Sequence, residues 1–184
     1  MSRLTAELRP HPTSPSEAIR RIGIEIDDEA FPRALWFRFR VEGDIGRIRL
    51  PAPGFARRSD GLWQHTCFEA FLRPDASESY HEFNFAPSGD WAAYRFGSRR
   101  AERTIPELPA PAIAFDAEPS HCSLSAEIPV AALPGLASAS SLQVAVSAVV
   151  AAADGRLSYW ALAHGGERPD FHDPAGFTLR VGRA

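Results

Sequence analysis

The stretch YHEFNFAPSGDWAAYRFG, residues 80–97, decides the fold. Phe83 and Phe85 alternate with polar residues in its first half, and aromatic residues alternate again in its second half. This period of two is typical of half-buried strands. The tetrapeptide PSGD at residues 87–90 is a turn sequence, because proline presets φ and glycine supplies a positive φ. The stretch therefore predicts an antiparallel hairpin.

The predicted hairpin also fixes which side chains leave the core. The phenylalanine face must be buried, so Glu82 and Asn84 project from the other face of the strand. A turn over residues 87–90 pairs Ala86 with Trp91. This register predicts that Glu82 lies directly opposite Arg95.

The same alternation recurs outward along the chain. Sixteen prolines and thirteen glycines leave little room for long helices. We expect one helical turn at residues 129–133. We expect strands near residues 20–26, 34–41, 46–50, 65–72, 80–86, 91–97, 112–116, 122–128, 142–151 and 157–163, and a last strand holding Phe177, Leu179 and Val181. About eleven short strands predict an all-β protein, and we expect a two-sheet antiparallel β-sandwich.

Length and charge bound the organisation and the partners. The 184 residues suit one domain, so we expect an N-terminal extension, residues 1–19, and a single domain, residues 20–184. The net charge of -3 argues against a nucleic-acid partner, which usually requires a basic excess. No stretch approaches the ~20 apolar residues of a membrane helix, so we expect no membrane partner.

The two cysteines, Cys67 and Cys122, bear on the compartment. Residues 1–21 contain no apolar stretch of the secretory kind. We therefore expect a cytoplasmic protein, in which both thiols are reduced and lie apart.

One outer face of the predicted sheet collects polar and aromatic residues. If the strand at residues 65–72 neighbours the hairpin, Glu69 shares the face of Glu82. The strand at residues 142–151 offers Ser147 among small side chains that leave a groove. The candidate ligand-binding residues are Trp63, Glu69, Glu82, Asn84, Arg95, Ser147, Trp160, His164 and His172. Sugar sites use such groups, since carboxylates and amides bind hydroxyls and rings stack on the apolar sugar face.

Other interpretations of these residues stay open. Glu82 and Arg95 also fit an ordinary cross-strand ion pair. The tryptophans also fit core or edge positions, and Trp160 joins the ligand face only if Tyr159 points inward. Parity within that strand does not decide between the two.

Catalytic and metal motifs are absent from the sequence. No two histidines have the spacing of a helical zinc motif, and we expect neither a metal ion nor a cofactor. No nucleophile elbow, P-loop or dinucleotide fingerprint occurs. Paired carboxylates on adjacent strands would suit glycoside hydrolysis, but a neighbouring Arg95 would lower the pKa that this chemistry needs raised. We therefore expect a binding module rather than an enzyme.

Several segments resemble DOMON-like domains, which are related to family 9 carbohydrate-binding modules. These segments are DGLWQHTCFEAFL at residues 60–72, YHEFNFAPSG at residues 80–89, WAAY at residues 91–94, SYWALAH at residues 158–164 and PDFH at residues 169–172. They look like the bacterial subgroup of unassigned function, and the resemblance covers roughly residues 20–182.

The resemblance implies a β-sandwich of the immunoglobulin-like or jelly-roll kind, with a ligand bound at a sheet face. Related domains bind sugars or haem. The haem branch uses a methionine and a histidine as axial ligands, whereas the only methionine here is Met1, outside the matched region. The sugar branch holds a ring between two tryptophans, for which Trp63 and Trp160 are the candidates.

The function expected from the sequence is therefore a non-catalytic module that binds a carbohydrate or a related polar metabolite. The alternatives are a haem or redox-partner DOMON domain and a protein–protein interaction domain. The sequence leaves the ligand and the oligomeric state undetermined.

Overall fold

The structure is a computed structural model that describes residues 3–182. Within these residues the chain forms eleven strands. They are β1 (Arg3–Pro10), β2 (Ile19–Asp27), β3 (Leu35–Gly43), β4 (Cys67–Pro74), β5 (Tyr80–Phe85), β6 (Trp91–Phe96), β7 (Ala112–Glu118), β8 (His121–Ile128), β9 (Ser141–Ala151), β10 (Leu157–Ala161) and β11 (Leu179–Gly182). The paired strands are antiparallel, so the all-β prediction is confirmed.

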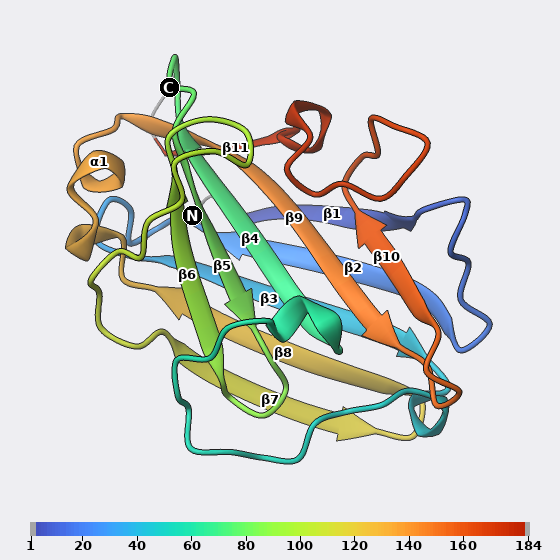
Figure 1. Cartoon of the computed structure of the whole chain (residues 1–184). Helices are drawn as coiled ribbons and strands as arrows, with labels where there is room; N and C mark the ends of the chain where they lie inside the picture. The colour runs from blue at the N-terminus through green and yellow to red at the C-terminus, as the bar shows by residue number, and fades with distance from the viewer. Residues whose placement is uncertain (1–2, 183–184) are drawn as a thin grey trace.

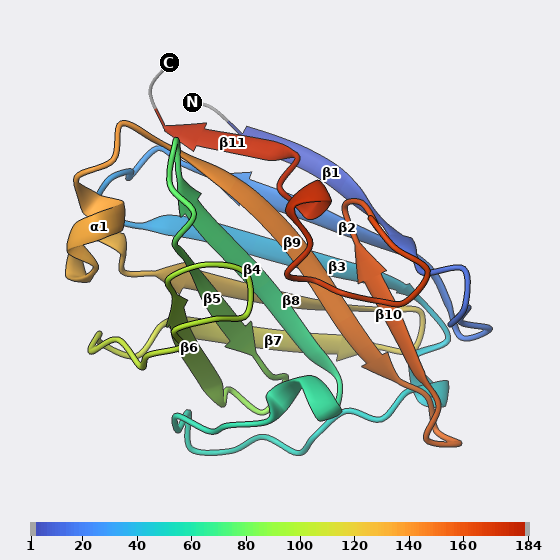
Figure 2. The ribbon, with the colours of Figure 1, turned by 45° about the horizontal axis from the view of Figure 1, so that its top comes forward.

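All eleven strands belong to one curled sheet. Its order is β6-β5-β4-β9-β10-β1-β2-β3-β8-β7, and β11 adds to β9. The sheet is continuous because β1 pairs with β2 over residues 3–8 and with β10 at residues 9–10. Figure 1 shows β6, β5, β4, β9 and β10 in front of the other half, and Figure 2 shows the same layering. Two separate sheets, as in the predicted sandwich, are not confirmed.

The core lies between the two halves of the curled sheet. Phe39 of β3 and Phe68 of β4 meet there with ring centroids 5.0 Å apart, and both are fully buried. Phe83 and Phe85 belong to the same core, as their alternation predicts. The opposite face of β4, β5, β6 and β9 is therefore turned away from this core and is available for a site.

Helical structure is confined to short turns. One α-helical turn, α1 (Pro134–Ala137), follows a 3₁₀ turn at Val130–Ala132, which lies within the helical turn predicted at residues 129–133. Across residues 3–182, no helix is long and apolar enough to span a membrane.

Two segments differ from the predicted strands. β1 lies within residues 1–19, where we expected an extension and no strand, and it occupies the middle of the sheet order. The strand predicted at residues 46–50 is instead a 3₁₀ turn, Ile45–Arg47, followed by an isolated bridge from Ile48 to Ala152. Ile45 and Ile48 are both buried and lie three residues apart, which suits the period of a 3₁₀ turn.

The β5–β6 hairpin forms, but its predicted register is wrong by one residue. Phe85, not Ala86, pairs with Trp91. The backbone N–H of Ala86 donates to the backbone carbonyl of Asp90. This bond leaves a three-residue loop, in which Gly89 has φ 89°. Because a shift of one residue moves every side chain of β6 to the other face, Tyr94 lies opposite Glu82.

The two thiols give a first testable prediction. Cys67 and Cys122 are both buried and not joined in a disulfide, as expected. Burial raises the pKa of Cys122 to about 12 and that of Cys67 well above its ordinary value. Ellman titration should therefore find no fast-reacting thiol in the native protein and two after denaturation, since the thiolate is the reactive form. Rapid reaction of the folded protein would contradict this packing.

Candidate ligand-binding site

A cleft of about 690 Å³ lies on the outer face of β4, β5, β6, β9 and β10. Its size is within the range of small-molecule sites. The lining residues are Trp63, Glu69, Glu82, Tyr94, Phe96, Arg100, Arg103, Val149, Tyr159, Arg168, Pro169, Phe171 and His172.

Two carboxylates form the polar floor of the cleft. Glu69 stands on β4 between Asn84 of β5 and Ser147 of β9, so these residues share the outer face as predicted. The Ser147 hydroxyl donates to Glu69 Oε2 at 3.3 Å, and the Asn84 amide donates to Glu82 Oε1 at 2.7 Å. Glu69 Oε1 is buried and has no hydrogen-bond partner in the described part of the chain. The floor of this concave site therefore includes a carboxyl with an unused oxygen.

The two carboxylates differ in electrostatic surroundings. Burial and the adjacent Glu82 charge raise the pKa of Glu69 well above its ordinary value. Burial also raises the pKa of Glu82, but the Asn84 hydrogen bond and the charges of Arg100 and Arg103 act in the opposite direction. Glu69 is therefore the carboxyl that retains a proton most readily, and Glu82 the one that ionises. With Glu69 protonated and Glu82 ionised, the floor combines a hydrogen-bond donor with a charged acceptor.

His172 connects the floor to an aromatic wall. Its Nδ1 lies 2.7 Å from the Tyr80 hydroxyl, and its Nε2 lies 3.5 Å from Glu82 Oε2. The ring packs edge-on against Phe96 and Phe71, with centroids 5.0 and 5.4 Å apart. Burial, followed by the Arg100 charge, lowers the pKa of His172 to about 4, so the imidazole is neutral near pH 7.

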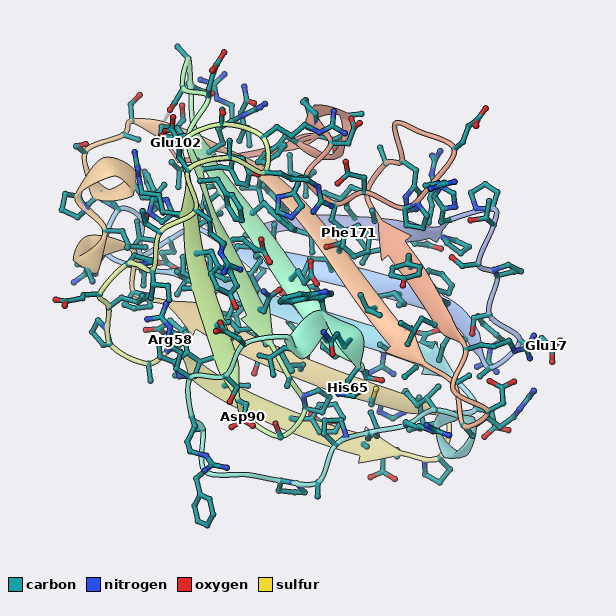
Figure 3. All side chains as sticks on the ribbon, in the orientation of Figure 1. Glu17, Arg58, His65, Asp90, Glu102 and Phe171 are labelled. Carbon is teal, nitrogen blue, oxygen red and sulfur yellow. The ribbon has the colours of Figure 1, made fainter. Side chains whose placement is uncertain are left out.

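Two loops form the wall above the floor. One, residues 97–104, follows β6, and the other, residues 164–177, follows β10. Figure 3 shows Glu102 and Phe171, which mark the two loops. Asp170 accepts from Arg99 at 2.6 Å and from Arg100 at 2.7 Å, which joins the loops to each other. The wall is thus held by ion pairs from both segments.

Trp160 does not lie in the cleft, contrary to the prediction. It pairs with Ala148, is 3% exposed and belongs to the core between the two halves of the sheet. Its indole N–H donates to Ser158 Oγ at 3.0 Å. Tyr159 takes the outer face instead and lines the cleft. In β10, therefore, Trp160 faces the core and Tyr159 faces outward, the reverse of what the predicted site required. The large indole fills space in the apolar core.

Two further predicted residues lie elsewhere. Arg95 pairs with His81 on the opposite face of the hairpin, as the corrected register requires. His164 lies outside the residues that line the cleft. Its Nε2 contacts the backbone carbonyl of Arg9 at 2.9 Å, and its ring meets that of His11. Of the remaining candidates, Trp63, Glu69, Glu82 and His172 line the cleft, while Asn84 and Ser147 support it from below.

The structure adds functional candidates that the sequence analysis missed. Tyr94 follows from the corrected register, because the three-residue loop around Gly89 turns it to the outer face. Arg100, Arg103 and Arg168 stand on loops, where alternation carries no information. Among residues 3–182, no group of three or more His, Cys, Asp or Glu side chains is arranged to hold a metal ion.

The buried Glu69 carboxyl predicts a pH dependence of stability. Above pH 4.5, its unperturbed pKa, the unfolded chain releases a proton that the folded protein retains. Stability is therefore lost as the pH rises from 4.5 toward the raised folded-state pKa, by up to about 1.4 kcal/mol per pH unit. Glu69→Gln removes this contribution. The unfolding free energy of the variant should therefore increase relative to that of the wild type as the pH rises. The effects of His81 and His172 occur in both proteins and cancel. Urea denaturation at several pH values between 4.5 and 8 measures both unfolding free energies. A constant difference between Glu69→Gln and the wild type over this range would contradict the prediction.

Comparison with known proteins places the fold beside carbohydrate-binding structures. No family model and no curated protein matches the sequence. A candidate carbohydrate-binding protein from Bacteroides uniformis is 19% identical with a TM-score of 0.69, over 95% of this chain and 84% of that one. A family 9 carbohydrate-binding module from Caldicellulosiruptor kristjanssonii, solved with cellotriose, is 13% identical with a TM-score of 0.54, over 98% and 84%. A family 9 module from the same organism, solved with glucose, is 13% identical with a TM-score of 0.51, over 97% of this chain and 85% of that one. The chain therefore shares the fold of carbohydrate-binding modules.

Proposed function

We propose that the protein is a non-catalytic module that binds a carbohydrate in the cleft above Glu69 and Glu82. The observation that carries the proposal is the floor itself. Glu69, a buried carboxyl whose Oε1 has no hydrogen-bond partner within residues 3–182, stands beside Glu82, and both residues line a concave site. A sugar hydroxyl can both donate and accept, so adjacent hydroxyls satisfy such a pair.

Aromatic side chains supply the second requirement of a sugar site. Trp63, Tyr159 and Phe171 line the cleft, and Trp63 remains 41% exposed at its rim. Rings in this position can stack on the apolar C–H face of a sugar. The neighbours solved with cellotriose and glucose share this fold, which supports the proposal at the level of ligand class. Kinship with DOMON-like domains is part of the same proposal.

Calorimetric titration with a panel of mono- and disaccharides tests this function. We expect saturable binding of at least one sugar. Tyr159→Ala should weaken it at least about tenfold, since a stacked ring contributes on the order of 1.4 kcal/mol. His164→Ala is the matched control, because His164 lies outside the lining residues, and it should bind like the wild type. Absence of binding by any sugar to the folded wild type, or equal losses in both variants, would refute the proposal.

A further inference from the structure

Two guanidinium groups in the cleft wall have no carboxylate partner. Arg103 and Arg168 line the cleft, yet neither forms an ion pair with any residue in the described range 3–182. The adjacent Arg99 and Arg100 are both paired with Asp170. The wall therefore holds two paired and two unpaired arginines, and within the described range the unpaired ones have all their N–H groups free of carboxylates.

The backbone fixes where Arg103 stands. Its neighbour Thr104 exchanges backbone hydrogen bonds with Arg95 at 2.8 and 2.9 Å, which extends the edge of β6. The Arg103 guanidinium lies over the Tyr94 ring, 5.0 Å from its centroid. A cation over an aromatic face is held in place without being neutralised. Arg103 is thus directed over the cleft.

Arg168 approaches from the other loop. It lies two residues before Asp170, the residue that joins both loops through Arg99 and Arg100. The two unpaired guanidiniums therefore belong to segments that are connected to each other.

The wall of the cleft, not its acidic floor, is suited to an anion. Arg100 and Arg103 lower the pKa of Glu82, yet within residues 3–182 no arginine forms an ion pair with Glu82. The wall carries the arginines and the floor carries the two glutamates, and all of them line the same cleft. Asp60, which accepts from Tyr94, brings one further negative charge to the Tyr94 side of the cleft. An anion would therefore be favoured at the wall and not at the floor.

We propose that the ligand is an anionic sugar whose carboxylate or phosphate group binds Arg103 and Arg168 while its hydroxyls bind Glu69 and Glu82. This inference rests on the proposed function and names its ligand class. Arginine binds both kinds of anion through paired N–H groups, and such charge-assisted hydrogen bonds are stronger than neutral ones. The raised pKa of Glu69 favours its neutral form and so limits repulsion at the floor.

Matched sugar pairs test the proposal by calorimetric titration. The pairs are glucose with glucuronate, galactose with galacturonate, and mannose with mannuronate, and glucose 6-phosphate represents the phosphate source. We expect at least one acidic member to bind about tenfold tighter than its neutral partner or more, because hydrogen bonds to charged groups exceed neutral ones. The preference should shrink in 0.5 M NaCl, as screening requires. A gain from phosphate alone assigns the anion to a sugar phosphate, and one from carboxylate alone assigns it to a sugar acid.

Variants show whether the two arginines carry the preference. Arg103→Gln and Arg168→Gln should each lose most of the preference for the acidic sugar. Arg20→Gln, an exposed change on β2, is the charge-matched control and should retain the preference. Neutral sugars that bind as tightly as acidic ones, or tighter, overturn this inference and leave the proposed function standing. Failure of every sugar to bind overturns both.

Discussion

Replacement of Trp160 by alanine is expected to lower the unfolding free energy by about 3–5 kcal/mol. The indole is 3% exposed, packs in the core between the two halves of the sheet and donates to Ser158. Its removal leaves a cavity where Phe, Val and Ala side chains of the sheet meet, and it leaves the Ser158 hydroxyl without that donor. Equilibrium urea denaturation measures the loss.

The same substitution at Trp63 is the matched control. Trp63 is 41% exposed at the rim of the cleft, so Trp63→Ala should cost little stability, within about 0.5–1 kcal/mol. It should weaken sugar binding instead, since it removes a stacking surface. If Trp160→Ala unfolds at the same urea concentration as the wild type, the inward placement of Trp160 is wrong.

The second large effect is expected for Asn84→Asp. Asn84 is fully buried and donates to Glu82, beside Glu69. The substitution preserves shape, removes the amide donor and adds a third carboxyl to the buried floor. We expect a loss of about 3–5 kcal/mol at pH 8, the usual cost of an uncompensated buried charge. The loss should be smaller at pH 5, where the new carboxyl takes up a proton more easily.

Two controls separate charge from packing. Gln64→Glu makes the same amide-to-carboxylate change at an exposed position and should change stability by less than about 0.5 kcal/mol. The double variant Glu82→Gln with Asn84→Asp restores a donor–acceptor pair with the direction reversed, so it should recover much of the stability. If the double variant is no better than Asn84→Asp alone, the hydrogen bond between these side chains does not support the floor.

The sequence predicted the interior of the hairpin and the floor of the cleft well. Phe83 and Phe85 have no tolerable position except the core, so alternation places Glu82 and Asn84 outside it. Ser147 and Glu69 follow by the same reasoning, once β4 and β9 are neighbours. Period-two patterns are reliable where one face of a strand is strongly apolar.

The sequence failed where alternation was ambiguous or absent. At Trp160, both faces of β10 carry a large aromatic residue, and the packing of Ala148 opposite decides which one turns inward. The hairpin register depended on whether Asp90 belongs to the loop, which a backbone hydrogen bond from Ala86 determines. Leu4, Ala6 and Leu8 do alternate in β1. The segment after them is rich in proline and serine, which favoured the prediction of an extension over that of a strand.

The arginine wall could not be predicted by any such pattern. Arg100, Arg103 and Arg168 line one cleft, and Asp170 joins the two loops that carry them, which are about seventy residues apart in sequence. Arginines are also spread along the whole chain, so these positions carry no distinctive signal.

Fluorine NMR of the protein labelled with 5-fluorotryptophan tests sugar binding in the cleft most directly. The chain has four tryptophans, and Trp63 is the one that lines the cleft. Its resonance can be assigned by its loss in Trp63→Phe. Titration with the matched sugar pairs, glucose and glucuronate first, should shift the Trp63 resonance in a saturable way and leave those of Trp36, Trp91 and Trp160 nearly unchanged. A Trp63 resonance that stays fixed with every sugar, or a shift confined to the other tryptophans, would contradict carbohydrate binding at this site.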